Sequence, residues 1–285
     1  MSADTGVLRI GEFARRVGVS RELLRAWERR YGLLQPIRSD GGFRLYTSDD
    51  AERVARMKSA LDEGLSASEA ARRALAHARS AEGLLDDARE RILAAARAYD
   101  DTAAQSALDE AFASFALDTV LRELVLPLLR EIGGEWERGE LEVGQEHFAT
   151  NLIRERLLAL ARFWGRGGGP LAILACPPGE RHDIGLIAFG LLLRSHGWRI
   201  LFLGADTPLP TLASAIETTS PRLVVVASMD GALLEAEGAG LRRLARSAPL
   251  VLSGAGATEE LAARLRLERA DGDLVAAAAA LSNAA

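Results

Sequence analysis

The sequence predicts a chain of three folded parts: a winged helix-turn-helix head, a four-helix bundle and a doubly wound parallel α/β domain. Three observations predict this fold class. The first 80 residues combine short helical patterns with glycine turns and an excess of basic residues. Residues 84–164 are rich in alanine and leucine at helical spacing, and the last third alternates apolar runs with helical segments. We place the domains at 1–80, 81–165 and 170–285.

Composition and charge limit the class of protein. Of the 285 residues, 48% are hydrophobic and 26% are charged, which is typical of a globular chain. No apolar run approaches the roughly 20 residues that span a bilayer, the first residues lack a secretion-signal pattern, and Cys176 is the one cysteine. We therefore expect a cytoplasmic protein with no membrane partner.

The charge is unevenly distributed. Residues 1–80 contain 15 Lys and Arg against 11 Asp and Glu, a net charge of +4. Because the whole chain carries −5, the remainder carries −9. Only the head is therefore expected to meet a polyanion such as DNA.

The head reads as helix, turn, helix and wing. A helical period over 10–17 ends at Gly18, and Ser20 is placed to cap a second helix with Trp27 on its buried side. The wing contains the hairpin turn 40–42, and helices are expected near 47–62 and from Ser66 or Ser68 to about residue 78.

Helices and strands are also expected along the rest of the chain. The pattern weakens over 79–87, which predicts a linker, and four helices follow near 84–98, 101–115, 117–138 and 143–163. Pro127 should kink the third of these, and 165–170 is a glycine-rich hinge. The strand candidates are 171–176, 199–204, 223–228, 249–254 and 265–268.

A set of arginines makes the head a candidate for binding double-stranded operator DNA, because arginine contacts both phosphates and base edges. A solvated basic helix is the simpler alternative. The candidates lie on the two helices and on the wing, and they are Arg15, Arg21, Arg25, Arg29, Arg30, Arg38, Arg44 and Tyr46.

The head resembles the DNA-binding head of the MerR family of regulators. That family has a helix ending in R-x-W-E-R-R-Y-G before a G-G-x-R-x-Y wing. The matching positions are Arg25, Trp27, Glu28, Arg29, Arg30, Tyr31, Gly32, Gly41, Gly42, Arg44 and Tyr46. By this resemblance the head is a MerR-type winged helix-turn-helix.

His182 is the candidate metal ligand of the α/β domain. It lies in a strand-to-helix loop at the carboxyl end of the strand 171–176, where open sheets bind ligands. Glu180, two residues earlier, could accept the other ring proton and fix the tautomer. One histidine supplies too few ligands for zinc but enough for a metal held in a macrocycle; a surface histidine that caps the helix is the alternative.

Two later strands end in short segments, Ser228–Met229 and Gly254 with Gly256. The small residues Ser228, Gly254 and Gly256 would leave a groove for an elongated group. Together with the histidine loop they resemble the cobalamin-binding, Rossmann-like (flavodoxin-like) domain of methionine synthase and its relatives, with elements D/E-x-H-x-x-G, S-x-L and G-G. Glu180, His182 and Gly185 match the first element, whereas Met229 and Ala255 depart from the other two. The resemblance implies that His182 ligates cobalt from below and that the nucleotide tail enters the sheet.

The bundle adds a candidate cap. Trp136 lies near the end of one helix and Glu146–His147 near the start of the next, so an antiparallel hairpin would bring these side chains to one rim of the bundle. The alternative is that Trp136 belongs to the bundle core and that Glu146–His147 is an exposed helix cap. The W-x9-E-H spacing and the three-part order resemble the CarH-type light-sensing repressors. That resemblance implies adenosylcobalamin bound in the dark, although methylcobalamin or hydroxocobalamin is possible. It also implies a homo-oligomer, a tetramer with cofactor and a dimer or monomer otherwise, that represses carotenoid-type genes until light breaks the cobalt–carbon bond.

Glu137 departs from this family pattern. In the best-known members a histidine follows the tryptophan and takes the upper cobalt position after illumination. We expect His147, water or Glu137 itself to serve instead, with a less stable or more reversible lit state.

Three other functions stay open, and none of them makes the chain an enzyme of its own. A light-independent cobalamin-binding MerR regulator differs from the light-sensing repressors only in that light does not control it. A corrinoid methyl carrier would share the bundle and sheet, but a basic winged helix would be of no use to it. A sensor of another small molecule, with a degenerate pocket, is kept open by Met229 and Ala255.

Overall fold

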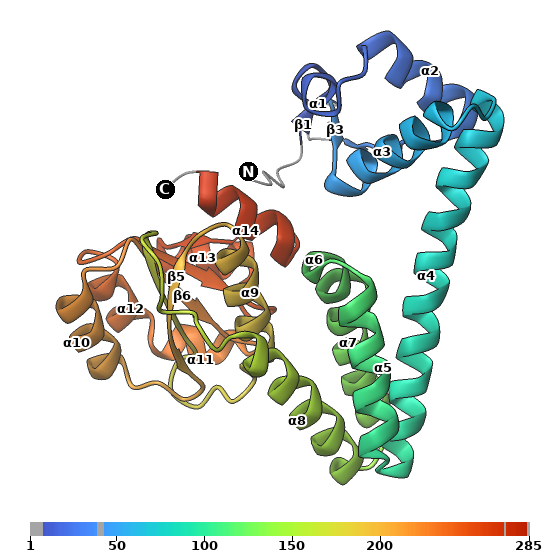
Figure 1. Cartoon of the computed structure of the whole chain (residues 1–285). Helices are drawn as coiled ribbons and strands as arrows, with labels where there is room; N and C mark the ends of the chain where they lie inside the picture. Colours follow the sequence, from blue (N-terminus) through green and yellow to red (C-terminus); the bar gives the residue numbers. More distant parts are fainter. Residues whose placement is uncertain (1–7, 39–42, 271, 284–285) are drawn as a thin grey trace. The chain divides into compact units, whose positions relative to one another are not determined.

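The computed structural model of the chain describes residues 8–38, 43–270 and 272–283, and the predicted fold class is confirmed (Figure 1). The chain separates into two compact units, Met1–Asp87 and Ala88–Ala285. The predicted wing turn at 40–42 lies outside the described residues. The bundle and the α/β domain belong to the second unit, so they are described together.

The first unit is a small three-stranded sheet with helices. Its elements are β1 Leu8–Arg9, α1 Ile10–Val17, α2 Arg21–Tyr31, β2 Ile37–Arg38, β3 Arg44–Tyr46 and α3 Ser48–Asp62. The antiparallel sheet has the order β1-β3-β2. Ser20 caps α2 by accepting a hydrogen bond of 3.2 Å from the Leu23 amide, as the sequence predicted. Phe13 and Tyr46 stack with their ring centroids 4.8 Å apart, and Trp27 is buried in the same core.

A single helix, α4, runs from Ala67 to Ala98. The predicted linker at 79–87 is therefore wrong, and the boundary between the units falls inside a helix rather than in a loop. Of residues 83–87 only Leu85 is buried, and a helix with so few buried residues has a weak hydrophobic period.

The rest of the bundle follows the predicted pattern of short turns. Its further elements are α5 Asp101–Ser114, α6 Leu117–Val120, the π-helical turn η1 Leu121–Val125, α7 Leu126–Glu137 and α8 Val143–Leu160. At η1 the Leu126 amide donates to the carbonyl of Leu121, five residues back. This wider turn lies just before Pro127, whose ring would otherwise clash with a preceding carbonyl. Where the sequence predicted a kink at Pro127, the structure has a π-helical turn just before it.

The α/β domain is a five-stranded parallel sheet of order β5-β4-β6-β7-β8. Its elements are β4 Leu171–Ala175, α9 Ile184–Ser195, β5 Arg199–Gly204, α10 Leu209–Thr219, β6 Leu223–Ala227, α11 Gly231–Ala236, α12 Gly238–Leu244, β7 Leu250–Ser253, α13 Glu259–Leu265, β8 Glu268–Arg269 and α14 Leu274–Asn283. The predicted strand at 265–268 is largely wrong, because Leu265 ends α13 and the strand begins at Glu268.

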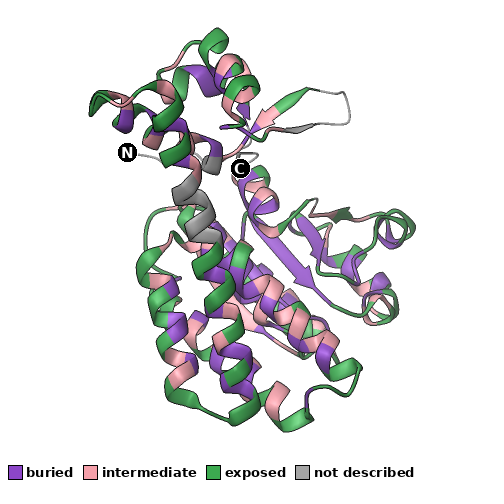
Figure 2. Cartoon of the chain, turned by 90° about the vertical axis from the view of Figure 1, so that its right-hand side faces the viewer, coloured by how far each residue is buried: buried purple, intermediate pink, exposed green. Residues whose placement is uncertain are grey.

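Helices cover both faces of this sheet. Side chains of α10, α11, α12 and α13 pack on alternate strand residues such as Ile173, Val224 and Leu252. Helices α9 and α14 pack against each other, and every residue of β6 is buried (Figure 2). Within the part of the chain that the structure describes, no helix is long and apolar enough to cross a membrane.

Candidate functional site

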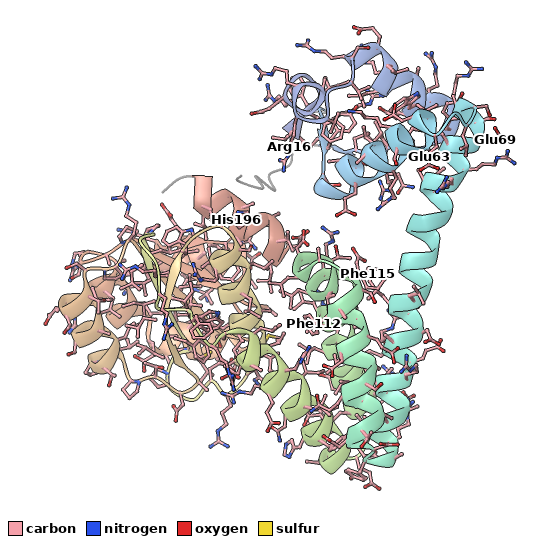
Figure 3. All side chains as sticks on the ribbon, in the orientation of Figure 1. Arg16, Glu63, Glu69, Phe112, Phe115 and His196 are labelled. Atoms are coloured by element: carbon pink, nitrogen blue, oxygen red, sulfur yellow. The ribbon has the colours of Figure 1, made fainter. Side chains whose placement is uncertain are left out.

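The basic surface of the first unit is carried mainly by α1 and α2. On these two helices the exposed members of the predicted set are Arg15, Arg21, Arg25, Arg29 and Arg30. Figure 3 shows this unit covered with charged side chains, including Arg16. The Arg21 guanidinium lies directly over Gly11, so close that an added Cβ there would stand 3.0 Å from it. Arg38 lies in β2.

The two predicted wing residues have different environments. Arg44 is half-exposed and donates through Nε to Glu28 Oε1 at 2.9 Å, whereas the Tyr46 hydroxyl donates to Glu28 Oε2 at 3.1 Å. Tyr46 is fully buried, so it offers no surface to DNA and the predicted contact is corrected. Burial and the Glu28 carboxylate raise its pKa to about 12. Glu28 thus ties α2 to the wing strand β3.

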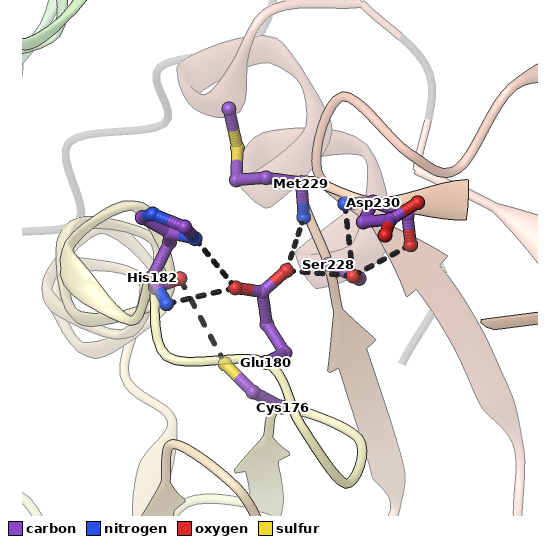
Figure 4. Close-up of polar contacts among 6 residues, drawn as sticks. All are labelled: Cys176, Glu180, His182, Ser228, Met229 and Asp230. Atoms are coloured by element: carbon purple, nitrogen blue, oxygen red, sulfur yellow. Dashed lines mark hydrogen bonds and ion pairs between the residues drawn. The ribbon is translucent and has the colours of Figure 1, made fainter. Parts of the chain in front are cut away.

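His182 lies at the switch point of the sheet. The strand order places β4 between β5 and β6, so successive strands are added on opposite sides of β4, and doubly wound folds bind ligands at such a point. The loop after β4 carries Glu180 and His182, and the loop after β6 carries Ser228 and Met229 (Figure 4). The structure therefore brings these four predicted residues together.

Glu180 organises this site. Its Oε1 accepts from the His182 amide at 2.8 Å and lies 2.7 Å from His182 Nδ1. Its Oε2 accepts from the Ser228 hydroxyl and from the Met229 amide, each at 2.7 Å. Burial would raise the pKa of this carboxyl, but the hydrogen bonds outweigh it and lower the pKa from 4.5 to about 2.

The His182 side chain is left 78% exposed, whereas that of Glu180 is only 2% exposed. A ring proton on Nδ1, donated to the charged Glu180, leaves Nε2 unprotonated and able to act as a metal ligand. Among the described residues no group of three or more His, Cys, Asp and Glu could hold a metal ion. A single exposed imidazole held by a buried carboxylate fits cobalt in a corrin ring, which needs one ligand from the protein.

The glycines of the site have different roles. A Cβ on Gly254 would stand 2.3 Å from the Ser228 carbonyl oxygen, and one on Gly256 would stand 2.5 Å from the Asp230 carbonyl carbon. These two glycines therefore let the loops after β6 and β7 touch, which is tighter packing than the groove we predicted. At Gly185, in the first turn of α9, a Cβ would meet nothing within 4 Å. Met229 and Ala255, the departures from the family pattern, are exposed beside them.

The cap residues flank the turn between α7 and α8. Trp136 and Glu137 end α7 and are exposed, and Glu146 and His147 lie in the first turns of α8. His147 Nε2 is 3.4 Å from Glu146 Oε2, and the His147 side chain is 68% exposed. An exposed tryptophan is not ordinary bundle core, so that alternative is excluded for Trp136.

Sequence reasoning missed an ion pair next to His182. Arg154 of α8 donates through Nε to Asp183 Oδ1 at 2.8 Å and through Nη2 to Oδ2 at 2.7 Å. Asp183 adjoins His182 in sequence, but its partner lies 29 positions away on another helix. No local spacing could have indicated this pair.

Comparisons with known proteins identify the family of the chain. The family of MerR HTH regulatory proteins matches residues 8–76, and the family of B12 binding domains matches residues 88–161. The HTH-type transcriptional repressor CarH of Myxococcus xanthus is 36% identical over 276 residues, covering 91% of this chain and 92% of the repressor. The chain belongs to the CarH-type, cobalamin-binding branch of the MerR family.

A second repressor supports this family, and a solved structure shares the fold. The CarA repressor of Myxococcus xanthus is 35% identical over 262 residues, covering 90% of this chain and 89% of its own. The Methanosarcina barkeri monomethylamine corrinoid protein is 18% identical with a TM-score of 0.57, covering 71% of this chain and 99% of its own, and shares the fold. This CarH-type chain is thus a transcriptional regulator with a cobalamin-binding region.

Proposed function

We propose that this regulator binds adenosylcobalamin in the dark, assembles as an oligomer on operator DNA, and leaves the DNA when light is absorbed. The observation that carries the proposal is the His182 imidazole, exposed and held through Nδ1 by the buried Glu180. A fixed tautomer and a fixed ring orientation are what an axial metal ligand requires.

Each group of residues has a separate part. His182 would hold the cobalt of the cofactor, and Glu180, itself fixed by Ser228 and Met229, would orient the imidazole. Trp136, Glu146 and His147 enclose the upper face, where bound adenosylcobalamin supplies a cobalt–carbon bond that light breaks. The exposed arginines of α1 and α2, with Arg44, contact DNA.

A switch of this kind needs two states whose populations the cofactor biases. The cap residues touch the cofactor's upper group in one state and are separated from it in the other. The bundle that carries them then alters the surface offered to a second protomer, and release from DNA follows because the separate protomers no longer bind DNA as a pair.

Size-exclusion chromatography of the full chain with adenosylcobalamin, in darkness and after green light, tests the proposal. We expect a coloured oligomer that breaks down on illumination, and we expect His182→Ala to lose the colour or the dark oligomer. A coloured species of constant size would favour the light-independent cobalamin-binding regulator. A colourless wild-type protein would contradict cofactor binding and favour a sensor of another molecule.

A further inference from the structure

An ion pair connects the helical bundle to the loop that carries His182. Arg154, in the second half of α8, makes two parallel hydrogen bonds with Asp183, at 2.8 Å and 2.7 Å. Two-point contact between a guanidinium and a carboxylate is the strongest and most directional form of this pair. The Asp183 side chain is only 3% exposed, whereas that of Arg154 is 40% exposed. The contact thus fixes a buried acid to a bundle helix.

Asp183 occupies a position where a carboxylate would ordinarily cap a helix. It is the residue before α9, and aspartate there commonly caps the helix by accepting from its first amides. Here its side chain makes no capping hydrogen bond, and only its backbone carbonyl accepts from Ile187, at 2.9 Å. Both carboxylate oxygens are taken by Arg154.

The two acids of the loop therefore attach it to different parts of the molecule. Glu180 fixes the loop to the end of β6 through Ser228 and Met229. Asp183 fixes it to α8. His182 lies between these two attachments, so its position depends on the bundle as well as on the sheet.

We propose that Arg154 and Asp183 form a latch that transmits the position of the bundle to His182. This inference rests on the proposed role of His182 as the cobalt ligand. Arg154 is a positioning residue, because it acts on His182 through Asp183. It follows His147 by seven residues on α8, roughly 10 Å along the helix axis, so one rigid helix joins the cap to the latch.

The physical basis is the cost of leaving a buried charge unpaired. If α8 moves away from α9, the buried Asp183 carboxylate must lose its partner or follow the helix. Losing the partner is the more costly course, so the loop follows. Beyond the latch, a groove of about 450 Å³ is lined by Phe112 and Leu160 of the bundle and by Leu191 of α9. Packing in this seam is incomplete, which leaves the bundle room to move.

Hydrogen exchange of the unliganded full chain tests the latch without cofactor. In Arg154→Gln and Asp183→Asn we expect exchange over 177–187, including the His182 amide, to rise about tenfold, while exchange over α5 stays unchanged. Arg91→Gln is the matched control. Arg91 makes a two-point pair with Glu110 inside the bundle and is equally exposed, at 40%. It should leave 177–187 unchanged.

Absorption spectra with hydroxocobalamin test the effect on His182. We expect the fraction of bound cofactor with imidazole ligation to fall several-fold in Arg154→Gln and Asp183→Asn, and Arg154→Lys to restore part of it. The double variant Arg154→Gln, Asp183→Asn has no unpaired buried charge, so it should fold even if a single variant does not, and it should still lack the latch.

The outcomes separate the two proposals. Exchange and ligation in the latch variants equal to those of the wild type would overturn the latch. A rise in exchange equally large in Arg91→Gln would overturn it too, because the effect would then be general loss of stability. Absence of imidazole ligation in the wild-type protein would contradict the proposed role of His182, and the exchange measurement would still decide whether the bundle and loop are coupled.

Discussion

Gly185 is a residue whose lack of a side chain the fold itself does not require. A Cβ there would meet nothing within 4 Å, although the residue lies in the first turn of α9 near His182. In helices glycine destabilises relative to other residues by roughly 0.5–1 kcal/mol. Space kept open at this cost, beside the candidate cobalt ligand, is consistent with a bound corrin.

Gly185→Leu is therefore expected to separate stability from binding. The melting temperature of the unliganded protein should stay the same or rise by a few degrees, because the helix gains a better helix former. Affinity for hydroxocobalamin should fall about tenfold or more, equivalent to roughly 1.4 kcal/mol or more, because the side chain fills the open space. Gly83→Leu, in the exposed middle of α4 and equally unobstructed, is the control. Undiminished binding by Gly185→Leu would place the cofactor elsewhere.

The Glu28 carboxylate divides the predicted DNA-binding residues of the wing into two kinds. Arg44 is half-exposed and Tyr46 is buried, yet both donate to Glu28. The first can reach a phosphate, whereas the second can only hold the first in place.

Salt titrations of operator binding distinguish these roles. Arg44→Gln and Arg29→Gln should weaken binding and reduce the slope of log affinity against log salt by about 0.9 for each phosphate that the variant no longer neutralises. Tyr46→Phe should keep that slope and lose about 1 kcal/mol of folding stability through one hydrogen bond, which thermal unfolding would record. A slope unchanged in both arginine variants would mean that the head docks by another surface.

Among the elements, α4 and η1 are helices that form although part of their sequence does not favour a regular α-helix. In α4 the segment 79–87 has no strong apolar face, yet the helix continues from Ala67 to Ala98. Its ends are fixed by packing: Ala70 and Ala74 are buried in the first unit and Ile92 and Ala96 in the second. Propagating a helix between two anchored ends needs no new nucleation. Helix η1 accommodates Pro127 by widening one turn.

At the scale of the whole molecule, the chain combines a MerR-type head with a bundle and sheet whose contact runs through α8 and α9. The two parts of the second unit meet at the latch, and the cap lies at the start of the same helix α8. If the cofactor binds as we propose, a change beside Glu146 and His147 would be transmitted along α8 to Asp183 and the loop of His182.

We predict that Glu137 determines how long the lit state lasts. It is exposed at the end of α7, next to Trp136, where the family resemblance places a histidine. We expect the wild-type lit state to revert readily, because a carboxylate is a poorer ligand for cobalt in this site than imidazole. Glu137→His should give a long-lived lit state with imidazole on both faces of cobalt, recorded by absorption during dark recovery. His147→Ala is the control, since His147 is the other exposed imidazole of the cap. A wild-type lit state that is already stable, and unchanged in His147→Ala, would contradict this prediction.

The sequence by itself determined the parts and their order, because each rests on local physics. Ser20 caps α2, Trp27 falls on the buried side of its helix, and the alternating strands and helices produce a parallel sheet. It also determined where the segment from Glu180 to Gly185 lies. A loop that follows a strand and precedes a helix must lie at the carboxyl edge of the parallel sheet.

Only the tertiary structure decided which residues far apart in the sequence contact one another. Glu28 joins Arg44 and Tyr46, Glu180 joins Ser228, and Asp183 joins Arg154. It also decided that Gly254 and Gly256 serve close packing, and that α4 continues through 79–87. These contacts depend on which surfaces meet when the chain collapses, and the side-chain spacing along a single helix or loop does not encode them.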